Sequence, residues 1–433
     1  MTAGAREATE GVSLRRRRWW SGLPRFDRRV WLLVGAMLVY RFGQGLYYPF
    51  STIYFHNVVG IPLSQIGIGL ATLAGTSVTS GLICGPVADR YGRKPLMLLA
   101  LSGSAAAFFA FAFVGDFRGY LIVCAAAGLV GTAMFDAARN AMVADVTREG
   151  MRARAYGLVR VGGNVGWALG PAVAGLIAAS AGTSADIYQV MFIGTATLML
   201  VVLVALALLA RESLPQTSKA KGRELPPVPL SKLRAAFADA PFAALLAAGL
   251  LLYYVFTQDW QALPIYSKNF LEVSDWQVGL FLAGNGLMVI LLQLPVAHLL
   301  DGRSKVAALA ACAGLFAASS ATLLVTGSFL GVLVAFAGFF TLAEMILEVA
   351  GAALAAELAP TDRRGTYLAL FGCCFGASYG ISPIVAGVLL DAGLPHIIWT
   401  IQLAAVALAA VGLVTLAALR KRRERDDQQR VEG

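Results

Sequence analysis

Long apolar runs separated by short polar connectors constrain the fold of this 433-residue chain more than any other feature. A run of about 20 apolar residues is long enough to cross the hydrocarbon core of a bilayer as a helix, and a helix satisfies its own backbone hydrogen bonds inside lipid. Such runs lie near residues 30–55, 64–88, 95–115, 119–144, 154–180, 187–210, 241–266, 275–299, 306–326, 328–357, 366–390 and 395–419. The pattern therefore predicts an all-α membrane protein with twelve transmembrane helices.

The composition supports one membrane bundle rather than several soluble domains. Hydrophobic residues make up 58% of the chain and charged residues 14%, whereas soluble domains have about 45–50% and 25%. The net charge of +10 could indicate a nucleic-acid partner, but the basic residues lie in short connectors and tails, not on one face of a soluble domain. We therefore expect a lipid bilayer as partner and no nucleic acid.

The distribution of basic residues predicts the orientation, because short cytoplasmic loops carry an excess of Lys and Arg. When successive connectors are assigned alternately to the two sides of the membrane, one side receives residues 15–18, Arg148, Arg152, Arg154, the segment 211–240, Arg303, Lys305, Arg363, Arg364 and residues 420–425. The other side receives only Arg118 and Lys268. This asymmetry predicts a multi-pass protein of the cell (cytoplasmic) membrane with both termini in the cytoplasm.

The chain divides into two similar halves. Residues 64–70 align with residues 274–280, and in the same register Gly92 and Arg93 fall on Gly302 and Arg303. A proline-containing polar stretch separates the copies and reads as a linker. The predicted units are a basic cytoplasmic segment (1–29), a six-helix bundle (30–211), a cytoplasmic linker (212–240), a second six-helix bundle (241–420) and a cytoplasmic tail (421–433). The two bundles should be pseudo-symmetric.

A charged motif fills the connector between the second and third runs. The spacing G-x-x-x-D-R-x-G-R-K, which ends at Lys94 and contains Gly85, Asp89, Arg90, Gly92 and Arg93, resembles the loop between helices 2 and 3 of the major facilitator superfamily. That resemblance covers residues 30–420 and implies a secondary transporter that works by alternating access, with substrate bound near midplane between the halves.

The resemblance also implies that this motif gates the cytoplasmic side. The gating residues would be the five above together with Asp145, which Arg93 should reach near the end of the fourth helix. In the second repeat, Leu299 stands where Asp89 would be. We therefore expect the gating acid to act mainly in the first half.

A second motif lies on the fifth predicted helix. Gly157, Gly166, Gly170, Pro171 and Gly175 follow a spacing that resembles the antiporter signature of drug–proton exporters in this superfamily, with Ala174 replacing one closing glycine. Small residues let a neighbouring helix approach closely, and proline bends a helix. The resemblance favours export, although glycine-rich packing is common in membrane helices and does not itself indicate direction.

The chain departs from those exporters on the fourth helix. They usually carry an arginine where this sequence has Cys124, four residues before Gly128. Their arrangement for proton coupling is therefore not carried over to this chain, and other ionisable residues are the candidates.

Seven ionisable residues lie within the apolar runs. Each costs about 2.5–3.5 kcal/mol at the bilayer centre, so they should face a cavity or one another. Asp136 and Arg139 are spaced to pair along one helix. Glu344 and Glu348 share a helix face, where two carboxylates repel, which favours protonation of one of them. We predict proton coupling through Glu344 and Glu348, with Asp259 as the next candidate; the alternative is a fixed ion pair with Arg41 or another base.

Three polar stripes predict the residues that line the substrate cavity. Each stripe follows helical spacing on one of the first, fifth and seventh runs. They consist of Arg41, Gln44 and Tyr48; of Arg160, Asn164 and Trp167; and of Tyr254, Gln258 and Gln261. Bases cluster in the first half and acids in the second, which suits a zwitterionic or amphiphilic organic solute. Residues 41–48 also resemble, without the preceding glutamates, the E-R-F-x-Y-Y segment of proton-coupled peptide carriers.

These features predict a carrier that exports an organic solute, a drug or a metabolite, in exchange for protons. The alternative within transport is proton-coupled uptake of a small zwitterion such as a peptide or amino-acid-like compound. An enzyme is not expected, because His56, His298 and His396 lack metal or nucleophile spacing. The five cysteines lie inside apolar runs and should be packing residues. We expect no cofactor, no metal and a monomer.

Overall fold

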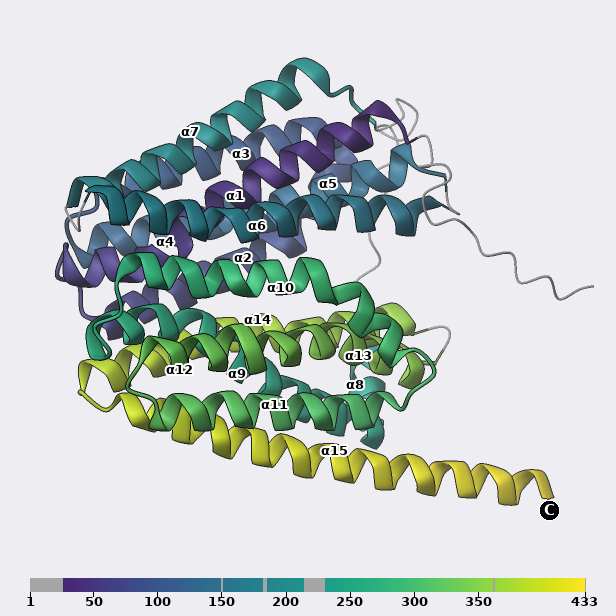
Figure 1. Cartoon of the computed structure of the whole chain (residues 1–433). Helices are drawn as coiled ribbons and strands as arrows, with labels where there is room; N and C mark the ends of the chain where they lie inside the picture. The colour runs from purple at the N-terminus through teal and green to yellow at the C-terminus, as the bar shows by residue number, and fades with distance from the viewer. Residues whose placement is uncertain (1–25, 149–150, 182–184, 214–229, 361–362, 433) are drawn as a thin grey trace, which may run out of the picture.

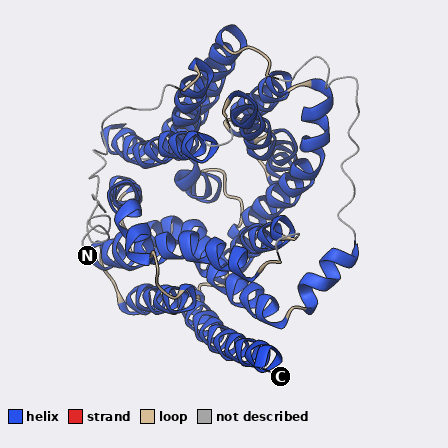
Figure 2. Ribbon diagram, turned by 90° about the vertical axis from the view of Figure 1, so that its right-hand side faces the viewer, coloured by secondary structure: helices blue, strands red, loops and turns tan. Residues whose placement is uncertain are grey.

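The structure is a computed structural model that describes residues 26–148, 151–181, 185–213, 230–360 and 363–432. Every regular element in these ranges is helical (Figure 2). The elements are α1 (Arg28–Asn57), α2 (Leu63–Tyr91), α3 (Arg93–Phe111), α4 (Phe117–Val130), α5 (Thr132–Val146), α6 (Arg152–Ala181), α7 (Ala185–Leu209), α8 (Leu230–Ala238), α9 (Ala240–Phe270), α10 (Asp275–Leu300), α11 (Lys305–Val325), α12 (Phe329–Leu333), the π-helix η2 (Val334–Phe340), α13 (Thr341–Leu358), α14 (Arg364–Asp391) and α15 (Pro395–Glu432).

The chain is a multi-pass helical membrane protein, as the sequence predicts. Within the described residues, eleven helical stretches are long and apolar enough to cross a bilayer. Two of them are composite, since α4 continues into α5 and α12 continues through η2 into α13. The 29-residue helix α2 packs among these stretches but is not one of the eleven. A count of twelve spans therefore depends on α2.

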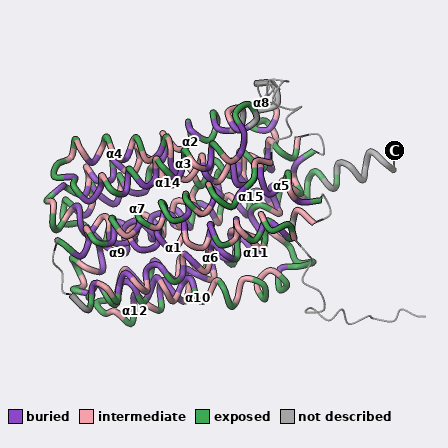
Figure 3. Tube along the Cα trace, turned by 90° about the horizontal axis from the view of Figure 1, so that it is seen from above, coloured by how far each residue is buried: buried purple, intermediate pink, exposed green. Residues whose placement is uncertain are grey.

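The helices run side by side in two groups (Figure 1). Helices α1–α7 lie together, and α9–α15 lie together beside them. Large apolar side chains such as Ile122, Leu208 and Val325 are 69%, 78% and 81% exposed, and exposed residues lie mainly on the outward-facing sides of the tube trace (Figure 3). Exposed apolar surface on this scale fits a bilayer rather than water.

Two expected runs are interrupted. The run at 119–144 breaks at Gly131, whose φ of −103° and ψ of −133° separate α4 from α5. The run at 328–357 contains the π-helix, which ends four residues before Glu344. Thr341 Oγ1, at the start of α13, donates to the Phe336 carbonyl of the π-helix at 2.9 Å. Such π-segments often occur at functional sites in helices.

The connecting segments differ in part from the expectation. Residues 1–25 and 214–229, which hold most of the predicted basic segment and linker, lie outside the described ranges. Within the predicted linker, α8 forms a short helix. The predicted tail continues α15 as far as Glu432. Arg423 in this tail lies 3.8 Å from Asp239, and Arg420, the last residue of the second predicted bundle, lies 3.8 Å from Glu357.

Candidate functional site

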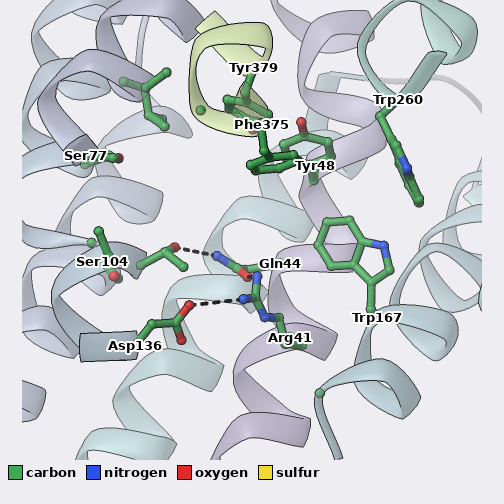
Figure 4. Close-up of a pocket in the computed structure, with 18 of the residues that line it drawn as sticks. Arg41, Gln44, Tyr48, Ser77, Ser104, Asp136, Trp167, Trp260, Phe375 and Tyr379 are labelled. Carbon is green, nitrogen blue, oxygen red and sulfur yellow. Dashed lines mark hydrogen bonds and ion pairs between the residues drawn. The ribbon is translucent and has the colours of Figure 1, made fainter. Parts of the chain in front are cut away.

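A cavity of about 890 Å³ lies between the two groups of helices. Its walls come from α1 to α6 on one side and from α9, α10, α13 and α14 on the other. Figure 4 shows how the polar side chains of the first group face aromatic side chains of the second. The size is that of a typical site for a small organic ligand.

Asp136 organises the charged side chains of the first wall. Its Oδ2 lies 3.3 Å from Arg41 Nη2, and its Oδ1 lies 3.0 Å from Arg139 Nη1. Gln44 extends this network, since its Oε1 accepts from Arg41 Nη1 at 2.8 Å and its Nε2 donates to Thr132 Oγ1 at 2.8 Å (Figure 4). The i,i+3 pair expected for Asp136 and Arg139 is present, and two arginines sharing one carboxylate leave a net positive charge.

The two glutamates of α13 both line the cavity but have different partners. Glu344 Oε2 accepts from Asn285 Nδ2 at 2.8 Å, a neutral donor on α10. Glu348 Oε2 lies 3.3 Å from Arg160 Nη2 on α6, and its Oε1 accepts from Tyr253 at 3.4 Å. The Arg160–Glu348 ion pair therefore joins the two groups of helices across the cavity, whereas Glu344 stays within its own group.

Aromatic rings cover much of the remaining wall. The ring centroids of Tyr48 and Trp167 are 5.6 Å apart, as are those of Trp167 and Trp260. Phe375 and Tyr379 on α14 continue this surface, with centroids 5.8 Å apart (Figure 4). Rings at these separations offer large, rigid apolar contacts to a ligand.

All six residues of the first two predicted stripes line the cavity, and those of the third stripe do not. Arg41, Gln44, Tyr48, Arg160, Asn164 and Trp167 are on its wall. On α9, the wall is formed by Phe256, Thr257 and Trp260. Tyr254, Gln258 and Gln261 are not among the lining residues. Each has a buried polar atom for which the described residues supply no hydrogen-bond partner. Helical spacing places these three residues on one face of α9 but does not show which face of the helix lines the cavity.

Asp259 is also outside the cavity wall. Its side chain is fully buried in the second group of helices, and its Oδ1 accepts from Gln402 Nε2 on α15 at 2.6 Å. Gln402 Oε1 in turn accepts from Ser320 on α11 at 2.7 Å. These bonds tie α9 to α11 and α15.

The basic end of the bundle, where α2, α5 and α7 end and α3 begins, carries the predicted gating motif. Arg93 Nε lies 3.3 Å from Asp145 Oδ2, the contact that the sequence predicts. Gly92 has a φ of 108°, a conformation that favours glycine. Arg90 lies over the Tyr91 ring at 5.4 Å. Asp89's side chain and the surroundings of Gly85 fall outside what the structure describes.

Glu212 is part of this network and was not predicted. Its two carboxylate oxygens accept from the backbone N–H groups of Arg93 and Lys94 at 3.0 and 3.1 Å, which caps the N-terminus of α3. Ser213 Oγ donates to Asp145 Oδ2 at 2.9 Å. The end of α7 is therefore fixed to α3 and α5, whereas the sequence only places these two residues at the start of a linker.

The glycine motif of α6 packs on two different helices. A Cβ on Gly166 or Gly170 would collide with α1 backbone, near Leu38 and Phe42. A Cβ on Gly175 would lie 3.0 Å from Gly279 Cα on α10. Pro171 is inside the helix, and no atom of the described residues would lie within 4 Å of a Cβ added at Gly157.

The end opposite the basic end, here called the closed end, joins the two groups of helices. It is marked by the α6–α10 contact at Gly175 and Gly279, by reciprocal 2.9 Å hydrogen bonds between Asn57 and Asn269, and by contact of α2 with α14. Below these contacts, the cavity wall runs from Phe55 and Tyr120 to Asn140, Tyr156 and Gln293, toward the basic end. The cavity is thus closed at one end and extends toward the other.

Sequence comparisons agree with the fold. A family model described as Major Facilitator Superfamily matches residues 33–301 and 260–433. The uncharacterized MFS-type transporter YttB of Bacillus subtilis (strain 168) is 26% identical over 368 residues, covering 84% of this chain and 89% of the relative. The multidrug resistance protein MdtH of Yersinia enterocolitica (serotype O:8 / biotype 1B) is 26% identical over 403 residues, covering 90% and 93%.

Solved structures share the fold at low identity. A POT family transporter in complex with 5-aminolevulinic acid has a TM-score of 0.70 and 15% identity, covering 90% of this chain and 96% of that chain. A peptide transporter POT in complex with sulfate has a TM-score of 0.73 and 17% identity, covering 90% and 94%. At these identities the likeness concerns the fold alone.

Proposed function

Because the chain belongs to the major facilitator superfamily and is a membrane transporter rather than an enzyme, we propose that it exports an organic solute in exchange for protons by alternating access. The multidrug resistance name of its Yersinia relatives supports export. The contacts at the closed end and the cavity that extends toward the basic end are what one state of such a cycle requires.

The observation that carries the proton-coupling proposal is the Arg160–Glu348 ion pair, which joins the two groups of helices. A proton on Glu348 removes its negative charge and so removes the attraction that holds Arg160 at 3.3 Å. The two groups can then move apart or rotate more easily. Glu344, one helical turn away and bound to neutral Asn285, is the second site where a proton can be held or released.

The proposed architecture has twelve spans, α2 included, in bundles of residues 30–211 and 241–420. The basic end would face the cytoplasm with both chain termini, in the cell membrane, and the carrier would act as a monomer. The density of Lys and Arg at this end supports the orientation. In this orientation the described state is open to the inside, and Arg93, Asp145 and Glu212 brace the first bundle there. Asp89, Arg90 and Gly85 complete the proposed gate.

The cavity walls support an amphiphilic solute. Arg41, Asp136, Arg139 and Arg160 offer charge on the first wall, and Trp167 and Trp260 offer apolar rings. Charges of both signs also favour the second candidate, proton-coupled uptake of a small zwitterion, because Arg160 and Glu348 stand on opposite walls. The two candidates differ in the relative direction of proton and solute.

Two variants in proteoliposomes test the coupling proposal. Glu344→Gln and Glu348→Gln should each insert and fold, and one of them should lose transport driven by a pH gradient while keeping exchange of solute down its own gradient. Exchange survives because rocking of the two bundles needs no net proton movement. Full pH-driven transport in both variants would rule out this pair and leave Asp259 to be tested.

A rigid strut gives a different result in the same experiment. If Glu348 only neutralises Arg160, then Glu348→Gln leaves a partly buried charge without its partner, at a cost of up to about 3–5 kcal/mol for a fully buried pair. Because Arg160 is 65% exposed and Glu348 36% exposed, solvent reduces that cost well below the buried value. A strut therefore predicts reduced gradient-driven transport and reduced exchange together.

A further inference from the structure

The N-terminus of α2 is capped by a residue from the other group of helices. The N-cap position holds Pro62, whose side chain makes no capping bond. The first two amides of the helix instead donate to Asp391 at the C-terminus of α14. Leu63 N–H donates to Oδ1 at 2.9 Å, Ser64 N–H donates to Oδ2 at 2.8 Å, and Ser64 Oγ donates to Oδ2 at 2.6 Å.

The two helices are shaped for this contact. Gly387 lies one turn before Asp391, and a Cβ there would collide with the Leu63 carbonyl. Gly67 lies one turn into α2, and a Cβ there would collide with the Pro383 carbonyl. A glycine on each helix thus lets the two backbones approach closely enough for the carboxylate to reach the helix terminus.

The equivalent helix of the second repeat is capped by its own residues. In the register that aligns residues 64–70 with 274–280, Ser64 corresponds to Ser274, the N-cap of α10. Ser274 and Gln277 form a capping box within α10, in which Gln277 N–H donates to Ser274 Oγ at 3.4 Å and Ser274 N–H donates to Gln277 Oε1 at 3.0 Å. One repeat therefore caps its own helix, and the other depends on Asp391 across the interface.

We propose that Asp391 is a gating residue that holds the closed end shut and must release α2 each time that end opens. The inference rests on the alternating access proposed above. Hydrogen bonds to an ionised carboxylate are stronger than those between neutral groups, and a negative charge is favourable at a helix N-terminus. These interactions exist only while α2 and α14 touch, so they favour the closed end over the open one.

The accessibility of position 51 from the closed end tests this proposal. Ser51 lines the cavity on α1, so Ser51→Cys in a cysteine-free background reports whether a membrane-impermeant maleimide can enter. Labelling in right-side-out and inside-out vesicles measures which side the reagent comes from. Asp391→Ala should raise the labelling rate from the closed end about tenfold, and Ser64→Ala, which removes one of three bonds, should raise it less.

The control is Ser274→Ala, which removes the same residue type from α10, the self-capped helix. This variant should keep the labelling rate of position 51 within about twofold of the parent, because the capping bonds that it breaks lie within α10. Hydrogen exchange of the Leu63 and Ser64 amides shows independently that the cap is lost. Loss of amide protection in Asp391→Ala with an unchanged labelling rate would overturn the proposal, as would an equal effect of Ser274→Ala.

The measurement needs no substrate, so its failure is distinct from failure of the proposed export. If Asp391→Ala does not fold, the graded effect of Ser64→Ala decides the question. If position 51 is never labelled from the closed end in any variant, that result would contradict both the gate and alternating access. A raised rate without proton-driven export would support the gate and remove only the proposed coupling.

Discussion

Replacing Gly279 by alanine should open the closed end of the carrier. A Cβ at Gly279 would lie 2.6 Å from the Pro171 carbonyl oxygen and 2.8 Å from Gly175 Cα. Carbon atoms prefer separations of about 3.5–4.0 Å, so the second contact is too short by about 0.7–1.2 Å. Both obstacles are backbone atoms, and α6 and α10 must move apart to make room.

The size of the effect follows from the cost of overpacking, which is about 1–3 kcal/mol. This cost falls only on the state in which α6 and α10 touch. The better helix propensity of alanine, about 1 kcal/mol, applies to both states and cancels. The ratio of open to closed molecules at this end should therefore rise about 5- to 150-fold.

The assay is maleimide labelling of Ser51→Cys from the closed end, with Gly284→Ala as the matched control. Gly284 is on the same helix, and its nearest contact, Ala337 Cβ, would lie at an ordinary 3.4 Å. Gly284→Ala should therefore label like the parent protein. Labelling of Gly279→Ala at the parental rate, or the same increase in Gly284→Ala, would show that the close α6–α10 contact does not keep this end closed.

Three further predictions concern other parts of the molecule. Glu212→Ala should lower the melting temperature of the purified carrier by a few degrees, because it removes the α3 cap, worth about 1 kcal/mol. Glu212→Gln keeps an acceptor and should lower the melting temperature less. Equal melting temperatures of the parent and both variants would contradict the cap. Asp259→Asn should keep pH-driven transport, since Asp259 is outside the cavity wall, and its loss would return Asp259 to the coupling site. Cysteines introduced at position 220 should be labelled only from the cytoplasm and cysteines at position 270 only from outside; external labelling of position 220 in intact cells would reverse the proposed orientation.

The helices were predictable because a membrane span requires only a sufficiently long continuous run of apolar residues. The Arg93–Asp145 contact was predictable from the resemblance of one loop. The break at Gly131 and the π-helix before Glu344 were not, because neither interrupts the hydrophobic pattern that marks a span. Glycine at 131 is one of many in this chain.

The unpredicted site residues depend on partners distant in sequence. Glu212 meets Arg93 across 119 positions, and Asp391 meets Ser64 across 327. Spacing along α9 showed which residues share a stripe but not which stripe faces the cavity, since that is set by packing against neighbouring helices. The missing cap at Pro62 was the one local signal that the start of α2 needed a partner from elsewhere.

Exchange of solute for protons can be measured by following both fluxes at once. The purified carrier is reconstituted with a pH-sensitive dye inside the vesicles, and a panel of organic cations, zwitterions and anions is added on one side. We expect a transported compound to drive protons in the opposite direction, and the proton signal to disappear in Glu344→Gln or Glu348→Gln. Protons that move in the same direction as the solute, or solute transport without any proton movement, would contradict it.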